Sequence, residues 1–308
     1  SEVASKLMEL VRHTMDESVR MPAHPPTLRP TLYKTAREML SLFRAIIPAS
    51  HRHEVATVPR TAAVLHNDCI FFAHHCLTLG LEYREQYSEE DARGKLLRQS
   101  CIFVDMVPLF RELADLSMGD MLDLQADQLV EIVGSRISYL GESLRSNESL
   151  QEWSDAETAM AAGIYHLRHL AQSWRPILSK RIFCQSIGHL SDVLLTLYWK
   201  QVTNMARVIT PNARHFLLGL FRKACQDLKE LFLEPQPQRC IEDCSNEWGR
   251  FLALVEFLDI PNLTQVQAAL ASGVFRQVSG QELAKWIEAL YPNETPERRT
   301  LLQSVLGA

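Results

Sequence analysis

Apolar residues recur at every third or fourth position along almost the whole chain, and this spacing limits the possible folds more than any other feature. In the first such stripe they fall at Val3, Leu7, Leu10, Val11, Met15 and Val19. Residues spaced in this way share one face of an α-helix, whereas a strand needs strict alternation, which never persists beyond a few residues here. Only 12 glycines and 14 prolines occur among 308 residues, so turn residues for hairpins are scarce. The sequence therefore predicts an all-α fold, an elongated bundle or rod of roughly a dozen antiparallel helices.

Prolines, glycines and capping residues divide these stripes into separate helices. Pro48 is expected to end the second helix, Thr57 to cap the third, and the segment 51–54 between them to be loop. Ser88 and Ser154 each stand three residues before an acidic residue, as in a capping box, and are expected to mark helix starts. The first helix is expected to continue a longer helix upstream. The expected helices span 3–19, 31–47, 59–87, 88–116, 120–144, 154–174, 179–205, 210–233, 245–258, 264–272, 281–290 and 296–306, with a linker at 235–238.

The length and the hydrophobic content of the chain allow a large core. With 308 residues, of which 46% are hydrophobic, two packed units are favoured over one. The most polar and turn-rich interval in the middle of the sequence is 141–153. We therefore expect a helical rod subdomain over 1–150 and a C-terminal helical subdomain over 151–308.

The charge of the chain argues against nucleic acid as a partner. The formal net charge is −5, and the nearest approach to a basic cluster is the pair Arg298-Arg299. Binding to a phosphate backbone normally needs a clustered basic stripe, which this sequence lacks. We therefore expect no nucleic-acid partner.

Cysteine usage and hydropathy indicate a cytoplasmic protein. The seven cysteines are odd in number and mostly fall inside apolar helical stripes, as buried reduced thiols do in the cytosol. The start of the chain lacks the pattern of a signal peptide, and no apolar run approaches the ~20 residues of a membrane span. We expect membrane association only at the periphery, through partners. A membrane-surface helix near the N-terminus is a further alternative, against which the acidic net charge argues.

The segment His66–Gly80 concentrates three histidines and two cysteines, and it is the first candidate for a metal or catalytic site. Its cysteines, Cys69 and Cys76, share the spacing of the apolar residues around them and so belong to one helical face. His66 lies eight residues from His74, more than two helical turns away and too far for joint ligation. The sequence predicts packing and capping roles for these side chains, and no metal site.

Other chemical motifs are weaker still. Cys240 and Cys244 lack the spacing of a zinc knuckle, and no second Cys/His pair follows closely. No glycine-rich phosphate loop, nucleophile elbow or Cys-x-x-Cys redox pair occurs. We therefore expect no catalytic residue and no cofactor. The alternative is a helical metalloprotein or enzyme whose ligands come from distant helices, since the chain has 11 histidines and seven cysteines.

The C-terminal segment is the best candidate for a docking surface. Trp286 and Tyr291 fall in short helices with little apolar sequence around them, so partial exposure is expected. Tryptophan, tyrosine and arginine dominate the binding energy of protein interfaces. The sequence therefore predicts partner binding by Phe275, Arg276, Trp286, Tyr291 and Arg298.

Two stretches carry a resemblance to a known family. The first is the His66–Gly80 segment, with Ala73-His74-His75 followed by Leu77-Thr78-Leu79-Gly80, and the second runs through 274–299 and includes Val274-Phe275-Arg276-Gln277-Val278. Both are similar to segments of the Zeste-White-Ten family of kinetochore and vesicle-tethering proteins, the second to its closing helices. The resemblance implies the C-terminal part of such a protein, a noncatalytic helical module of the CATCHR tethering type.

The resemblance also implies partners and places of action. Family members act at kinetochores with a Rough-Deal-type subunit and Zwilch, in checkpoint signalling and dynein recruitment. They also tether Golgi-derived vesicles at the endoplasmic reticulum, with a neuroblastoma-amplified-sequence protein and a Rad-fifty-interacting subunit. For this end of the chain, the resemblance implies contact with the large Rough-Deal-type or neuroblastoma-amplified-sequence-type subunit. It also implies a cytoplasmic location, peripheral at the endoplasmic reticulum membrane and at the kinetochore in mitosis.

Overall fold

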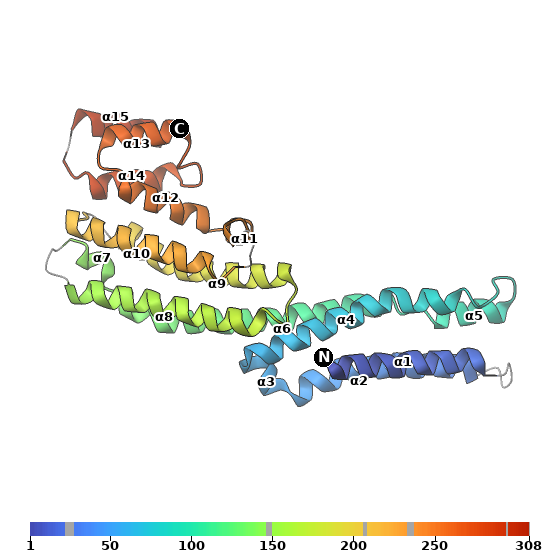
Figure 1. Ribbon diagram of the computed structural model, residues 1–308. Helices are drawn as coiled ribbons and strands as arrows, with labels where there is room; N and C mark the ends of the chain where they lie inside the picture. The colour runs from blue at the N-terminus through green and yellow to red at the C-terminus, as the bar shows by residue number, and fades with distance from the viewer. Residues whose placement is uncertain (22–27, 146–149, 206–207, 233–236, 294, 308) are drawn as a thin grey trace. The chain divides into compact units, whose positions relative to one another are not determined.

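The computed structural model describes residues 1–21, 28–145, 150–205, 208–232, 237–293 and 295–307. The regular elements in these residues are α-helices and one π-helix, and no strand occurs among them (Figure 1). The prediction of an all-α fold is therefore confirmed. By their internal contacts the residues divide into two compact units: unit 1 comprises 1–124 with 176–178, and unit 2 comprises 125–175 with 179–308. The expected division into domains at residue 150 stays a prediction.

Unit 1 is built from five helices and the first part of a sixth. They are α1 (Glu2–Arg20), α2 (Leu28–Ser50), α3 (Arg52–Thr57), α4 (Pro59–Arg84), α5 (Ala92–Ser100) and α6 (Met106–Ile137), whose last residues belong to unit 2. Its core is formed by one apolar stripe from each long helix. Val11, Leu40, Phe72 and Phe110 are at most 1% exposed, and the rings of Phe72 and Phe110 lie 5.3 Å apart. Burying side chains of this size contributes about 1.5–3 kcal/mol each.

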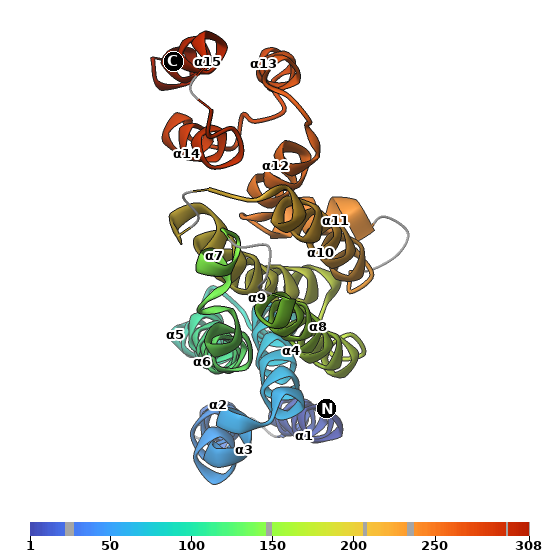
Figure 2. The ribbon, with the colours of Figure 1, turned by 90° about the vertical axis from the view of Figure 1, so that its left-hand side faces the viewer.

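Unit 2 holds the rest of α6 and the remaining helices, and Figures 1 and 2 both show α12 between α10 and α14. Its core is rich in aromatic rings, for example Phe221, which lies 4.8 Å from Phe251 and 6.2 Å from Tyr198 between ring centroids. The elements are α7 (Leu140–Ser143), α8 (Leu150–Trp174), α9 (Lys180–Lys200), the π-helix η1 (Gln201–Met205), α10 (Pro211–Lys229), α11 (Pro237–Cys244), α12 (Trp248–Asp259), α13 (Leu263–Ser272), α14 (Gly280–Leu290) and α15 (Pro296–Leu306).

Helix caps explain why several starts were predicted correctly. Ser179, Thr210 and Thr295 each accept a hydrogen bond from the backbone N–H three residues later. Ser279 forms a full capping box with Glu282. Such caps satisfy N–H groups that have no partner inside the helix, which is why the sequence signal is strong.

Three expectations about helix ends in 48–57 are wrong. Helix α2 continues through Pro48 to Ser50, because a proline in the last turn removes a single hydrogen bond. The expected loop 51–54 is the start of α3: the Val55 N–H donates to the His51 carbonyl at 2.8 Å, and this bond closes the turn. Thr57 is not the cap of α4, which begins after Val58 without a side-chain cap.

Both predicted capping-box starts also fall at different residues. Helix α5 begins after Asp91, whose carboxylate accepts a hydrogen bond from the Gly94 N–H, while Ser88 accepts one from the Glu90 N–H in the preceding turn. A break at 101–105 then divides the expected helix 88–116 into α5 and α6. Helix α8 begins at Leu150, so Ser154 lies inside it. The predicted linker 235–238 falls partly outside the described residues.

Candidate functional site

The His/Cys segment of α4 is part of the core of unit 1. Cys69, Phe72 and Cys76 are 0% exposed and point to the same side of the helix, as the sequence predicted. Burial raises the pKa of both thiols to about 12, so neither is a thiolate near neutral pH. These two cysteines therefore act as small apolar side chains.

The three histidines of α4 do not converge. The buried His66 places its Nδ1 3.0 Å from the carbonyl oxygen of Ala114 in α6. His74 is exposed, and the ring of His75 packs 4.3 Å from that of Phe71; burial lowers the pKa of His75. Among the described residues, no group of three or more His, Cys, Asp or Glu side chains is arranged to hold a metal ion. Along α4, the structure thus gives these histidines packing contacts and positions on the surface.

Two of the predicted partner-binding residues lie in the core of unit 2. Phe275 and Trp286 are each 3% exposed, so the expected partial exposure of Trp286 is wrong. The indole of Trp286 packs 5.1 Å from the ring of Trp199 and 5.3 Å from that of Phe257. Phe275 also packs against Phe257, with the ring centroids 5.7 Å apart. The apolar neighbours that bury Trp286 come from α9 and α12, far away in sequence.

The other three predicted residues remain at least partly accessible. Tyr291 is half-buried, and its hydroxyl donates to the Ile260 carbonyl at 2.6 Å. Arg298 is also half-buried, and it donates to the Pro292 carbonyl at 3.1 Å. Arg276 is exposed, next to the left-handed Gly273 that ends α13. Of the five, Arg276 therefore presents the most freely available side chain.

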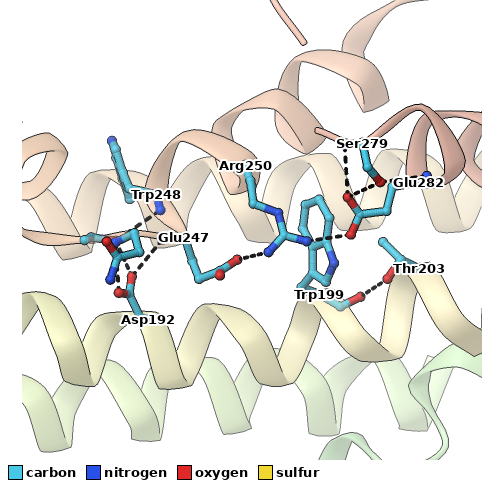
Figure 3. A network of polar contacts seen from close by, with 10 residues as sticks. Asp192, Trp199, Thr203, Glu247, Trp248, Arg250, Ser279 and Glu282 are labelled. Carbon is cyan, nitrogen blue, oxygen red and sulfur yellow. Dashed lines mark hydrogen bonds and ion pairs between the residues drawn. The ribbon is translucent and has the colours of Figure 1, made fainter. Parts of the chain in front are cut away.

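A polar network that the sequence did not predict joins α9, α12 and α14 (Figure 3). The Arg250 guanidinium forms ion pairs with Glu247 at 2.6 Å and Glu282 at 2.5 Å, and it lies 4.6 Å from the ring centroid of Trp199. Burial alone would raise the pKa of Glu282. Hydrogen bonds from Ser279 and the charge of Arg250 outweigh this effect, so the pKa is lowered.

A second part of the same network caps α12 from a neighbouring helix. Asp192 of α9 accepts hydrogen bonds from the Ser245 hydroxyl, from the Asn246 N–H at 2.9 Å and from the Glu247 N–H at 3.1 Å (Figure 3). The Ser245 hydroxyl in turn accepts from the Trp248 N–H at 3.0 Å. A carboxylate at a helix N-terminus both satisfies free N–H groups and complements the helix dipole. Because Asp192 lies more than fifty residues from these partners, no local motif could have predicted the cap.

In this network, ion pairs neutralise the charged side chains, and carboxylates cap the starts of helices. These groups therefore stabilise the fold. Within the described ranges, no helix combines the length and hydropathy needed to span a bilayer. These features define the class as an all-α protein with two helical units, inside which aromatic packing and helix caps stabilise the helices.

Comparison with known proteins places the chain more closely. Residues 1–131 match the family model described as "Centromere/kinetochore protein zw10, C-terminal", and residues 158–305 match "ZW10 C-terminal helical domain". The chain belongs to the ZW10 family, of which it represents a C-terminal portion. The family resemblance seen in the sequence is thereby confirmed.

Curated relatives agree with this assignment. The mouse "Centromere/kinetochore protein zw10 homolog" is 27% identical over 210 residues, which cover 68% of this chain and 25% of the mouse protein. The Arabidopsis thaliana homolog of the same name is 21% identical over 306 residues, covering 98% of this chain and 39% of that protein. The Caenorhabditis elegans homolog is 20% identical over 245 residues, 74% of this chain and 30% of that protein. The chain thus spans well under half the length of these relatives.

Proposed function

We propose that the chain is a noncatalytic interaction module of a multisubunit complex that acts at the kinetochore. The observation that carries the proposal is the match of the two C-terminal family models to most of the chain, together with curated relatives that are named as centromere and kinetochore proteins. A module of this kind works by holding its surface in a fixed shape for a partner, which requires a stable helical framework.

The use of its charged and thiol groups supports a noncatalytic role. The thiols of Cys69 and Cys76 are packed in the core of unit 1, and His66 pairs with a backbone carbonyl. In unit 2, Arg250 is neutralised by two glutamates, and Asp192 caps a helix. A catalytic centre instead brings a nucleophile or base and a place for substrate together. Each of these groups is occupied with holding the fold.

The finer proposal concerns partners and cellular roles. We propose that the module contacts a large subunit of the Rough-Deal type at kinetochores, in checkpoint signalling and dynein recruitment. The same module would contact a neuroblastoma-amplified-sequence-type subunit in Golgi-to-ER vesicle tethering. Its location would be cytoplasmic, peripheral at the endoplasmic reticulum through partners, and kinetochore-bound in mitosis.

The surface proposed for this contact is centred on Arg276. Val274 beside it is 44% exposed, and both side chains stand on the turn that follows α13. Phe275, directly between them, is anchored in the core and would fix the position of this turn. Tyr291 and Arg298 are the other accessible members of the proposed set. An exposed arginine next to an apolar side chain on a rigid support is a typical interface anchor.

A binding experiment with purified components tests the proposal. The chain would be titrated onto immobilised Rough-Deal-type and neuroblastoma-amplified-sequence-type subunits, and the Kd measured by biolayer interferometry. Arg276→Ala should weaken binding roughly tenfold, the loss expected of an interface anchor. Arg181→Ala, which removes an exposed arginine from α9, is the matched control and should change little. Absence of binding to either subunit would refute the partner assignment, and equal effects of the two substitutions would refute the placement of the surface.

A further inference from the structure

Three of the seven cysteines line a single cavity in unit 2. Cys184 comes from α9, and Cys240 and Cys244 come from α11. The cavity has a volume of about 520 Å³, and its lining also includes Lys180, Arg181, Arg239 and Asp243.

The register of the two helices places Cys184 opposite Cys240. The backbone of Gly188 lies directly against Cys244: a Cβ added to Gly188 would stand 2.3 Å from the Cys244 carbonyl oxygen and 3.0 Å from its Cβ. Cys184 precedes Gly188 by one helical turn, and Cys240 precedes Cys244 by one turn. Further along, Asp192 meets Ser245 and Glu247, so residue numbers on both helices increase in the same direction. One turn back from the Gly188–Cys244 contact, Cys184 therefore faces Cys240.

The side-chain contacts agree with this register. The Cys184 thiol is hydrogen-bonded to that of Cys240, and the Cys244 thiol to that of Cys184. Cys184 is buried, whereas Cys240 and Cys244 are half-buried at the cavity and accessible to small solutes. Cys225, a buried cysteine of α10, lines no part of this cavity. Proximity of two thiols favours their disulfide at equilibrium, because the second step of its formation is intramolecular.

We propose that Cys184 and Cys240 form a reversible disulfide bond by exchange with a small disulfide such as glutathione disulfide, and that this bond ties α11 to α9. In the first step the accessible Cys240 thiolate attacks glutathione disulfide, forms a mixed disulfide and releases one glutathione thiolate. The Cys184 thiolate then attacks the Cys240 sulfur, forms the protein disulfide and releases the second glutathione. The protein loses two electrons and two protons, which the two glutathione molecules carry away as thiols.

The burial of Cys184 sets the rate of this exchange, while geometry sets its equilibrium. Burial, followed by the neighbouring Cys240, raises the pKa of the Cys184 thiol to about 12. Only a small fraction is therefore thiolate at neutral pH, so the second step is slow and accelerates as the pH rises toward 9. The same cavity is also lined by three cationic side chains and one carboxylate, namely Lys180, Arg181, Arg239 and Asp243.

A redox titration of the intact chain tests the proposal. The protein would be equilibrated at pH 8 with glutathione buffers of increasing oxidised fraction, alkylated, and digested with trypsin. Cys184 then falls in the peptide 182–200, and Cys240 and Cys244 fall together in 240–250. The proposed bond links these two peptides, whereas a bond between Cys240 and Cys244 would stay inside one. We expect the linked pair to accumulate through one transition, and to exceed its level in Cys240→Ser roughly tenfold at the same buffer.

Matched variants make the outcome decisive. Cys184→Ser should abolish the linked pair, and Cys225→Ser should leave its level unchanged; far-UV circular dichroism of each variant would establish that it is folded. Glutathione retained on Cys240 as the final product, or a bond confined to 240–250, would overturn the proposal. The absence of the linked pair from the folded wild-type chain at the most oxidising buffer would overturn it as well.

Discussion

The cysteines of α4 in unit 1 and those of α9 and α11 in unit 2 differ in how their sequence spacing relates to their positions in the fold. In α4, cysteines and histidines crowd within eleven residues, but Cys69 and Cys76 are packed among apolar side chains while His74 faces solvent. In unit 2, Cys184 lies more than fifty residues from Cys240, and the fold brings the two to one cavity. A cluster in sequence is thus dispersed around a helix, and a cluster in space is assembled from separate helices.

The difference follows from helix geometry. Consecutive residues on a helix point about 100° apart, so a dense run of one residue type is spread over all its faces. Residues on two packed helices meet only if their registers agree, which the sequence of either helix does not state. The close contact of Gly188 with Cys244 is what fixes the register in unit 2. A cluster of one residue type along the sequence is therefore a poor predictor of a site, and the register between packed helices is a better one.

The largest effect is expected when an aromatic group at the core of unit 2 is removed. Trp286→Ala should lower the free energy of unfolding by about 3–5 kcal/mol, because it removes a ring packed against Trp199 and Phe257 and leaves a cavity. Urea denaturation followed by circular dichroism measures the change. Tyr165→Ala, at a position of α8 that is 70% exposed, is the control and should stay within about 0.5 kcal/mol. A cost for Trp286→Ala below about 1 kcal/mol would show that the residue is not part of the core.

A smaller change in the free energy of unfolding is expected when a buried cysteine of unit 1 and a half-buried cysteine of unit 2 are each replaced by serine. Cys76→Ser in unit 1 should cost about 1–2 kcal/mol, because it buries a hydroxyl that can at best donate to a carbonyl one turn earlier. Cys240→Ser in unit 2 should cost less than about 0.5 kcal/mol under reducing conditions, because that side chain is only half-buried. Thermal and urea unfolding of both variants in reducing buffer would measure the pair. Equal costs would mean that the cysteines of the two regions do not differ in environment.

The helical fold could be predicted from the sequence because the signals involved are local. Apolar periodicity predicted the helices, and their expected starts at residues 179, 210 and 281 lie within two residues of the observed caps Ser179, Thr210 and Ser279. The errors lie where two local signals compete. Pro48 normally ends a helix but stands in a last turn here, and Asp91 replaces Ser88 as the cap because its carboxylate reaches the Gly94 N–H.

The candidate surface could be predicted only in part, because burial depends on partners elsewhere in the chain. Trp286 lies in a short helix with few apolar neighbours of its own, and the rings that cover it belong to Trp199 and Phe257. The cap of α12 by Asp192 could not be predicted either, because Asp192 lies on a helix that is distant in the sequence. An arginine such as Arg276 is easier to place, since a charged side chain is seldom fully buried without a partner.

The smallest expected effect concerns the charge network of unit 2 that is centred on Arg250. The pKa of Glu282 is lower in the folded chain than its ordinary value of 4.5, so its ionised form stabilises the fold at pH values above that value. This contribution is lost as the pH falls through the lowered pKa. Glu282→Gln should therefore reduce the free energy of unfolding at pH 7 by less than about 1 kcal/mol, and this difference from wild type should shrink as the pH falls below 4.5.

The control for this prediction lies on the same helix. Glu288→Gln changes an exposed glutamate of α14 and should give no comparable pH-dependent difference. Urea unfolding of the three proteins between pH 3.5 and 7, read as the free energy of unfolding, separates the two cases. These limits reach from about one pH unit below the ordinary glutamate pKa of 4.5 to about two and a half units above it. A Glu282→Gln difference that stays constant over this range would mean that the hydrogen bonds from Ser279, which a glutamine oxygen can also accept, hold the helix start without help from the charge. In that case the ion pair with Arg250 would contribute orientation to the network and little stability.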